Sequence, residues 1–390
     1  NGPQILGNLG LVLLCAYIAG SPPLPLRRLP APALQRLLLE PRPSGARFRR
    51  TRFMWNICLP CMPRRGELRG FAILATSSFR KGAGMTADNP SDFSYESVRE
   101  TADPVLRRGY WDVATGLQQV DGLAPSDYLL SLAREHASGV RGIEETGRIL
   151  RAYYRERPHR GFGSQAATAA DGDDCREADL VSQRIVEALS RGAFSFMPSM
   201  LSVIHEALFR DLDPQVYEPG RYKTVALQKS ELVLNGDSVV YADPSLVERS
   251  LAFLFDEEFG YVYGADLDEE GIAHLARFVA RLWQVHPFVE GNTRTVAVFT
   301  VLYLRYLGFD ADNEPFGRHA RYFRDALVRA NYRNAKAKVM PDASYLLRFF
   351  ENLLSGEHHE LRSRDLMVSE LYADPSLLRN ADPSRAISKP

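Results

Sequence analysis

Apolar side chains recur at helical spacing in two neighbouring segments of the C-terminal half of the chain. The first segment, 271–285, contains no helix breaker and is predicted to be a helix with one face in the core. The second, 295–307, is apolar on nearly every side and stops at Gly308, a residue suited to a left-handed C-terminal cap. It is therefore predicted to be a buried central helix. The apolar positions of the first helix are Leu275, Phe278, Val279, Leu282 and Trp283.

The loop between these two predicted helices is the most informative part of the sequence. Residues 286–294 read His-Pro-Phe-Val-Glu-Gly-Asn-Thr-Arg. The last four, Gly291, Asn292, Thr293 and Arg294, fall at the start of the second helix. Backbone N–H groups without intrahelical acceptors and the positive end of the helix dipole favour an anion there. The sequence thus predicts an anion-binding cradle at this helix end.

The side chains of this loop suit phosphate chemistry. Histidine titrates near neutrality, so His286 can accept a proton from a hydroxyl group. Glu290 is a hard oxygen ligand beside a phosphate site, which is how proteins normally hold magnesium. Arg294 is permanently charged and forked, and Gly291 lets the backbone come close to an oxyanion. We therefore predict His286 as general base, Glu290 as Mg²⁺ ligand and residues 291–294 as the phosphate cradle.

The string from His286 to Arg294 resembles the signature of the Fic family, H-x-F-x-[D/E]-G-N-G-R-x-x-R. Members of that family transfer AMP from ATP to a hydroxyl group on a target protein. The resemblance implies a Fic-type helical core over roughly residues 180–354, with ATP as substrate and Mg²⁺ as cofactor. It also implies a protein adenylyltransferase that joins AMP to a serine, threonine or tyrosine hydroxyl and releases pyrophosphate.

Segments on either side of the motif resemble other parts of the same family. Residues 202–225 resemble a helix and the start of a β-hairpin flap, and the Asn235-Gly236 turn signal supports a hairpin. In the family this flap pairs with an extended segment of the target, so the resemblance implies a protein target docked there. It also places Thr224 and Val225 at the nucleotide. Residues 322–334 resemble the helix that completes the nucleotide pocket, with Asn331 and Tyr332 near the adenosine.

Two positions depart from the family pattern. Thr293 stands where most AMP-transferring members have glycine and where a kinase-like branch has lysine, and its β-branched side chain crowds the cradle. Ala297 stands where the family has a second arginine, which grips the terminal phosphate. The departures leave two alternatives open. One is a Fic-fold protein kinase or another nucleotidyl transferase, and the other is a nucleotide-binding module that has lost turnover.

An N-terminal helical segment resembles the small antitoxin domain that accompanies some Fic enzymes. Within residues 110–155, Ser126-Asp127 is a clear helix N-cap signal. The antitoxin domain carries an inhibitory glutamate that pairs with the second arginine of the motif; here Asp121 stands in its place, and Leu117 replaces the expected serine or threonine. Because Ala297 removes the partner of such a lock, we expect this segment to restrain the enzyme weakly or by bulk. The alternative is an accessory domain that only packs.

Charge divides the chain into two unlike parts. Residues 1–84 hold 13 Lys and Arg against Glu40 and Glu67, whereas the remainder is acidic. We interpret residues 1–84 as a disordered leader or a reading-frame extension ahead of Met85. Its apolar run is short for a membrane span and its basic run lacks an aromatic platform, so neither a membrane nor a nucleic acid is expected as a partner. Beyond Met85 the sole cysteine is Cys175, which suits the cytoplasm.

The predicted organisation follows from these segments. A helical antitoxin-like domain covers residues 95–157, a Gly-rich linker 158–176, the Fic domain 177–355 and a polar tail 356–390. The fold class is mainly α, with a small β-hairpin flap. At 390 residues and 45% hydrophobic, the chain can bury a full core. The sequence leaves the target protein, the nucleotide preference and the oligomeric state open.

Overall fold

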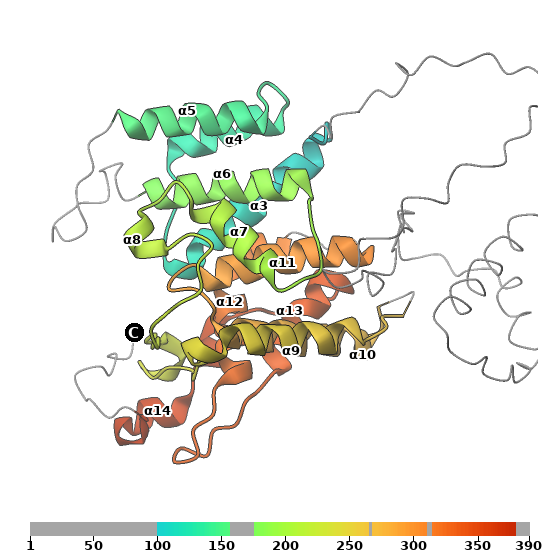
Figure 1. Cartoon of the computed structure of the whole chain (residues 1–390). Coiled ribbons are helices and arrows are strands. Elements are labelled where there is room, and N and C mark those ends of the chain that lie inside the picture. The colour runs from blue at the N-terminus through green and yellow to red at the C-terminus, as the bar shows by residue number, and fades with distance from the viewer. Residues whose placement is uncertain (1–99, 157–174, 265–266, 310–313, 380–390) are drawn as a thin grey trace, which may run out of the picture. The chain divides into compact units, whose positions relative to one another are not determined.

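The computed structural model describes residues 100–156, 175–264, 267–309 and 314–379 (Figure 1). These residues form twelve α-helices and five short 3-10 helices. Their only β pairing is an isolated bridge between Asn334 and Val339, so the expected mainly helical class is confirmed. No helix in this part of the chain is both long and apolar enough to cross a membrane. The predicted leader, most of the predicted linker and the end of the predicted tail lie outside the described residues.

The helices follow one another along the chain with short connections. The α-helices are α3 (Pro104–Gly116), α4 (Asp127–Ala137), α5 (Ile143–Arg155), α6 (Arg176–Arg191), α7 (Ser199–Phe209), α8 (Pro214–Tyr217), α9 (Val247–Phe259), α10 (Glu269–Val285), α11 (Asn292–Leu307), α12 (Glu314–Asn331), α13 (Ser344–Leu354) and α14 (Ser369–Ala373). The 3-10 helices are η2 (Leu117–Asp121), η3 (Leu232–Leu234), η4 (Pro244–Leu246), η5 (Ser363–Leu366) and η6 (Pro375–Leu377).

Helix α11 is the centre of the packing. Every residue from Asn292 to Leu304 is buried, as the all-round apolar pattern predicts. The helix contacts α6, α7, α10 and η2, and Gly308 ends it in the left-handed conformation with φ 85° (Figure 1). The first turn of α11, which carries the motif, is therefore held on several sides by other elements.

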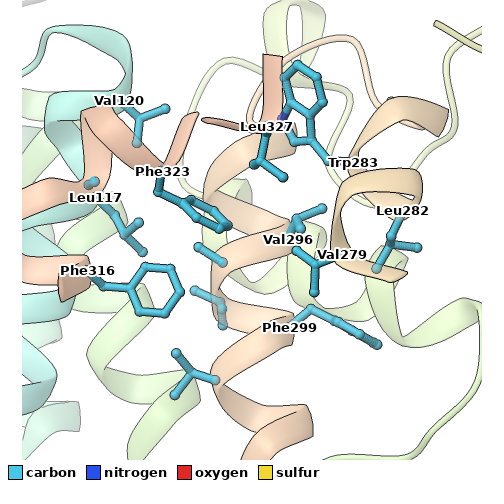
Figure 2. Close-up of a cluster of buried hydrophobic side chains, with 14 of the residues drawn as sticks. Leu117, Val120, Val279, Leu282, Trp283, Val296, Phe299, Phe316, Phe323 and Leu327 are labelled. Carbon is cyan, nitrogen blue, oxygen red and sulfur yellow. The ribbon is translucent and has the colours of Figure 1, made fainter. Parts of the chain in front are cut away.

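The N-terminal helices pack on the same core. Helix α3 contacts α6 and α12, and the crossing with α12 is close because it pairs two glycines. A Cβ atom on Gly116 would lie 2.2 Å from the carbonyl oxygen of Gly317. Immediately after this crossing, Leu117 and Val120 of η2 join a buried cluster with Phe323 of α12 (Figure 2). The crossing thus fixes where η2 begins, next to the first turn of α11.

The predicted β-hairpin flap is wrong. Asn235 and Gly236 do form a turn with positive φ angles of 52° and 88°, but residues 224–241 contain no strand. The C-terminal segment binds this turn and takes its backbone acceptors. The Val368 N–H donates to the Val233 carbonyl at 2.9 Å, and the Asn235 side chain donates to the Leu371 carbonyl at 2.8 Å. The partner of the turn is therefore a distant segment and not the adjacent strand.

Candidate active site

His286 ends helix α10 and faces the first turn of α11. Its backbone adopts a left-handed conformation with φ 49°, and its N–H donates to the Trp283 carbonyl at 3.0 Å. The imidazole stacks on the Tyr241 ring at a centroid distance of 3.9 Å and is only 6% exposed. Burial, together with Lys223 and Lys229, holds the pKa of His286 well below its usual value. The ring is therefore neutral at neutral pH and can accept a proton.

Asn292 closes the loop between His286 and α11. Its side-chain oxygen accepts from the Phe288 N–H at 2.9 Å, and its amide donates to the Phe288 carbonyl at 2.7 Å. No side chain in the described part of the chain caps the first turn of α11. The N–H groups at that helix end are therefore left for an anion, as the sequence predicts.

Two residues outside the motif brace this loop. His205 accepts at Nδ1 from the Gly220 N–H at 2.9 Å, so its Nε2 carries the proton and donates to the Glu290 carbonyl at 3.0 Å. Burial lowers the pKa of His205 to about 4, which keeps this arrangement at neutral pH. Lys223 donates from its backbone to the Pro287 carbonyl at 2.8 Å and from Nζ to the Val285 carbonyl at 3.3 Å. Sequence reasoning treated His205 as a packed residue and missed Lys223, whose pKa burial lowers to about 8.

Thr293, which replaces the glycine of the family pattern, has a partner in the core. The Trp283 indole Nε1 donates to the Thr293 hydroxyl at 2.9 Å, and both residues are buried. The threonine therefore fastens the first turn of α11 to the end of α10. This contact gives a structural reason for a hydroxyl-bearing residue at a position that crowds the cradle.

Thr293→Val is expected to lower the free energy of unfolding by about 1–3 kcal/mol, because the buried Trp283 N–H loses its acceptor. Thr293→Ser keeps a hydroxyl and should stay closer to the wild-type stability. Urea unfolding followed by tryptophan fluorescence measures both. Equal midpoints for the valine and serine variants would show that this hydrogen bond does not contribute.

Arg294 is engaged by acidic groups from the N-terminal half of the chain. Its guanidinium lies 3.1 Å from the Asp121 carboxylate and 2.8 Å from that of Glu177, and Nη1 also donates to the Gln118 side chain at 3.2 Å. The group is 1% exposed, and its Nε has no hydrogen-bond partner among the described residues. The predicted phosphate-binding arginine is thus occupied by carboxylates in this conformation.

Asp121 lies at the end of η2 and bridges two cations. One carboxylate oxygen contacts Arg294, and the other contacts the Lys229 Nζ at 3.2 Å. The sequence-based expectation was that an Asp121 lock has no arginine to bind, because residue 297 is alanine. The structure pairs Asp121 instead with the first arginine of the motif. That contact is long-range, so no local pattern could show it.

The cavity in front of His286 is small. Its volume is about 10 Å³, room for about one water molecule, whereas pockets for drug-sized ligands measure about 300–1,000 Å³. A nucleotide therefore requires this site to open. The cavity is lined by Asp121, Lys229, Glu231, Trp283, His286, Glu290, Asn292, Thr293 and Arg324.

Glu290 fits the predicted role of a magnesium ligand. Its carboxylate is 36% exposed, accepts from the Gly291 N–H at 3.0 Å and lies 3.5 Å from the Lys229 Nζ. No group of three or more metal-binding side chains occurs within the described residues. One carboxylate beside a phosphate cradle suits Mg²⁺ that shares its coordination with substrate phosphates and water.

The remaining predicted nucleotide residues lie away from this cavity. Thr224 and Val225 are exposed at a bend. The Asn331 side chain donates to the Ala280 carbonyl at 2.9 Å. Tyr332 is fully buried and donates to the Asp237 carboxylate at 2.6 Å. None of these four lines the cavity, and their contact with a nucleotide stays a prediction.

The structure therefore defines a mainly helical protein with a histidine and an anion cradle on adjoining helix ends. Residues 195–304 match the model of the Fic/DOC family, and this part of the chain is a Fic/DOC domain, as the motif predicts. The probable protein adenylyltransferase y4lH of Sinorhizobium fredii (strain NBRC 101917 / NGR234) is 29% identical over 154 residues, which cover 39% of this chain and 72% of that protein. No solved structure matched the chain.

Proposed function

We propose that this protein transfers AMP from ATP to a serine, threonine or tyrosine hydroxyl of a target protein. The observation that carries the proposal is the loop from His286 to Arg294, which holds a buried neutral imidazole beside the uncapped first turn of α11. The Fic/DOC match and the similarity to a protein named a probable protein adenylyltransferase support the same reaction.

The reaction balances with groups of this chain. His286 accepts the proton of the target hydroxyl, and the hydroxyl oxygen forms a bond to the α-phosphorus of ATP. The bond from that phosphorus to the bridging oxygen breaks, and pyrophosphate leaves with the electron pair. The N–H groups of the first turn of α11 stabilise the negative charge that develops on the phosphate oxygens. Glu290 would hold Mg²⁺, which neutralises phosphate charge when bound.

Two ATP analogues separate this reaction from the kinase alternative. With β,γ-methylene ATP, AMP transfer remains chemically available and phosphate transfer does not; α,β-methylene ATP reverses this. The chain is incubated with Mg²⁺, each analogue and a cell lysate, and modified peptides are identified by mass spectrometry. AMP addition from ATP and β,γ-methylene ATP alone is expected. A phosphate adduct from α,β-methylene ATP would replace the proposal with a kinase, and nucleotide binding without any adduct would favour a binding module.

Asp121→Ala is expected to tighten ATP binding by about 5- to 150-fold, the usual range for coupling between a restraint and a ligand. The carboxylate now holds Arg294 and Lys229, two cations that a phosphate needs. Isothermal titration calorimetry with ATP and Mg²⁺ measures the dissociation constant. Asp121→Asn keeps the size and removes the charge, so tightening in both variants assigns the restraint to charge and tightening in alanine alone assigns it to bulk. Unchanged affinity in both would contradict the restraint.

A further inference from the structure

The site lacks a cation where the family motif has its second arginine. Ala297 is fully buried in α11, and its methyl group contributes nothing to phosphate binding. The terminal phosphates of ATP carry most of the charge of the triphosphate. An ATP site without that arginine therefore needs positive charge from another element.

Two cations outside the motif line the cavity in front of His286. Lys229 comes from the segment after α8, and Arg324 comes from α12. They share this cavity with Glu290 and Thr293, the metal-ligand and cradle positions of the motif. Neither is part of the sequence signature, and both are placed there by tertiary packing.

The Arg324 guanidinium is held in position by the protein. Nη2 lies 2.6 Å from the buried Glu231 carboxylate, and Nη1 donates to the Val120 carbonyl at 3.0 Å. A guanidinium fixed by one carboxylate and one carbonyl is preorganised, because little side-chain freedom remains to be lost when it binds a ligand. Its planar fork can still present N–H groups to a phosphate.

The Asp121 carboxylate shows that this position accepts an anion. It contacts Lys229 on one oxygen and Arg294 on the other. Arg294, Lys229 and Arg324 together lower the pKa of Asp121, in that order, against the effect of its burial. An anionic group in this place is therefore stabilised by three cations, of which the motif supplies one.

We propose that Lys229 and Arg324 bind the terminal phosphates of the nucleotide and replace the arginine that Ala297 lacks. This inference rests on the proposed function, because it assigns two further residues to the same nucleotide site. Arg324 supplies directional hydrogen bonds, and Lys229 exchanges its contact with Asp121 for a contact with phosphate. The ligand class is a nucleoside triphosphate, recognised by its β- and γ-phosphates.

The test compares dissociation constants for ATP and AMP, measured by calorimetry with Mg²⁺ in the full chain and in an Asp121→Ala background. Arg324→Gln and Lys229→Gln are each expected to weaken ATP binding by about 10- to 100-fold, the equivalent of one charge-assisted hydrogen bond. AMP binding should change less than about twofold, because AMP lacks the two phosphates that these cations bind. Arg318→Gln is the matched control on α12, since the Arg318 side chain is 73% exposed.

A second variant protects the test from a folding defect. Arg324→Gln alone leaves the Glu231 carboxylate buried without its cation, which destabilises a protein more than removal of the whole pair. The double variant with Glu231→Gln removes both charges and should show the same selective loss of ATP affinity. Equal losses for ATP and AMP, or no loss, would overturn the inference while leaving the proposed function in place. Absence of nucleotide binding in both the wild type and Asp121→Ala would reject the proposed function itself.

Discussion

His286→Ala is expected to lower the rate of AMP transfer by about 100- to 10,000-fold, the usual contribution of a general base. The imidazole is neutral because burial holds its pKa well below the usual value, and its Nδ1 has no hydrogen-bond partner among the described residues. Alanine removes the proton acceptor and leaves the cradle of α11 in place. Initial rates of AMP incorporation into a target peptide measure the effect.

The control for this variant is nucleotide affinity. The dissociation constant for ATP should stay close to the wild-type value, since His286 acts on the hydroxyl and not on the nucleotide. A variant that binds ATP normally and transfers AMP at the wild-type rate would remove His286 from the mechanism. Loss of binding and transfer together would point to a collapsed loop instead.

The low pKa of His286 also fixes the sign of a pH effect. The folded protein binds this proton less readily than the unfolded chain, in which a histidine titrates near about 6.5. The stability contributed by the neutral ring is therefore complete above that pH and is lost as the pH falls below it. Titration of His286 should not reduce the transfer rate between about pH 8 and 6.5, since the ring stays neutral there.

Gly291→Ala is expected to destabilise the fold by roughly 2–5 kcal/mol. Gly291 has φ 74°, a conformation that costs other residues about 1–2 kcal/mol. An added Cβ would also lie 2.3 Å from the Phe209 ring, and such overpacking costs about 1–3 kcal/mol. Denaturant unfolding, with the midpoint and slope fitted together, gives the loss.

Gly308 offers a matched control at the other end of the same helix. Its φ is 85°, but no atom lies within 4 Å of a Cβ built there. Gly308→Ala should therefore show the backbone cost alone, and the difference between the two variants isolates the clash with Phe209. Combining Gly291→Ala with Phe209→Ala should cost less than the sum of the single changes. Equal losses for Gly291→Ala and Gly308→Ala would show that the ring moves aside freely.

Local sequence patterns predict the helices of the site well. The apolar spacing of α10, the all-round apolar sequence of α11 and the cap at Gly308 agree with the structure, because each depends on residues within a few turns. The N-cap at Ser126 is also confirmed, since its hydroxyl accepts from the Leu129 N–H at 3.0 Å. The turn at Asn235 was predicted correctly, yet the strands around it were not, because the C-terminal segment competes for the same backbone groups.

The electrostatics of the site could not be predicted in this way. Asp121 and Arg294 are far apart in the sequence, and so are Glu231 and Arg324. Ion pairs of this kind leave no periodicity, and their partners are chosen by the crossing of whole helices. The family resemblance did direct attention to Asp121, although it suggested residue 297 as the partner. The residues that chemistry needs were therefore visible, while the contacts that occupy them were not.

The crossing of Gly116 with Gly317 limits how the site can open. Helix α3 cannot slide across α12 without separating two backbones in direct contact, so the start of η2 is a fixed pivot. The far end of η2 is free of that constraint, because Asp121 is its last residue and Gly122 follows in a left-handed conformation with no atom within 4 Å of a Cβ built there. A 3-10 helix has poorer hydrogen-bond geometry than an α-helix and unwinds at lower cost. Admission of a nucleotide is then a matter of one short turn swinging on an anchored stem, and the helical layer above it can stay where it is.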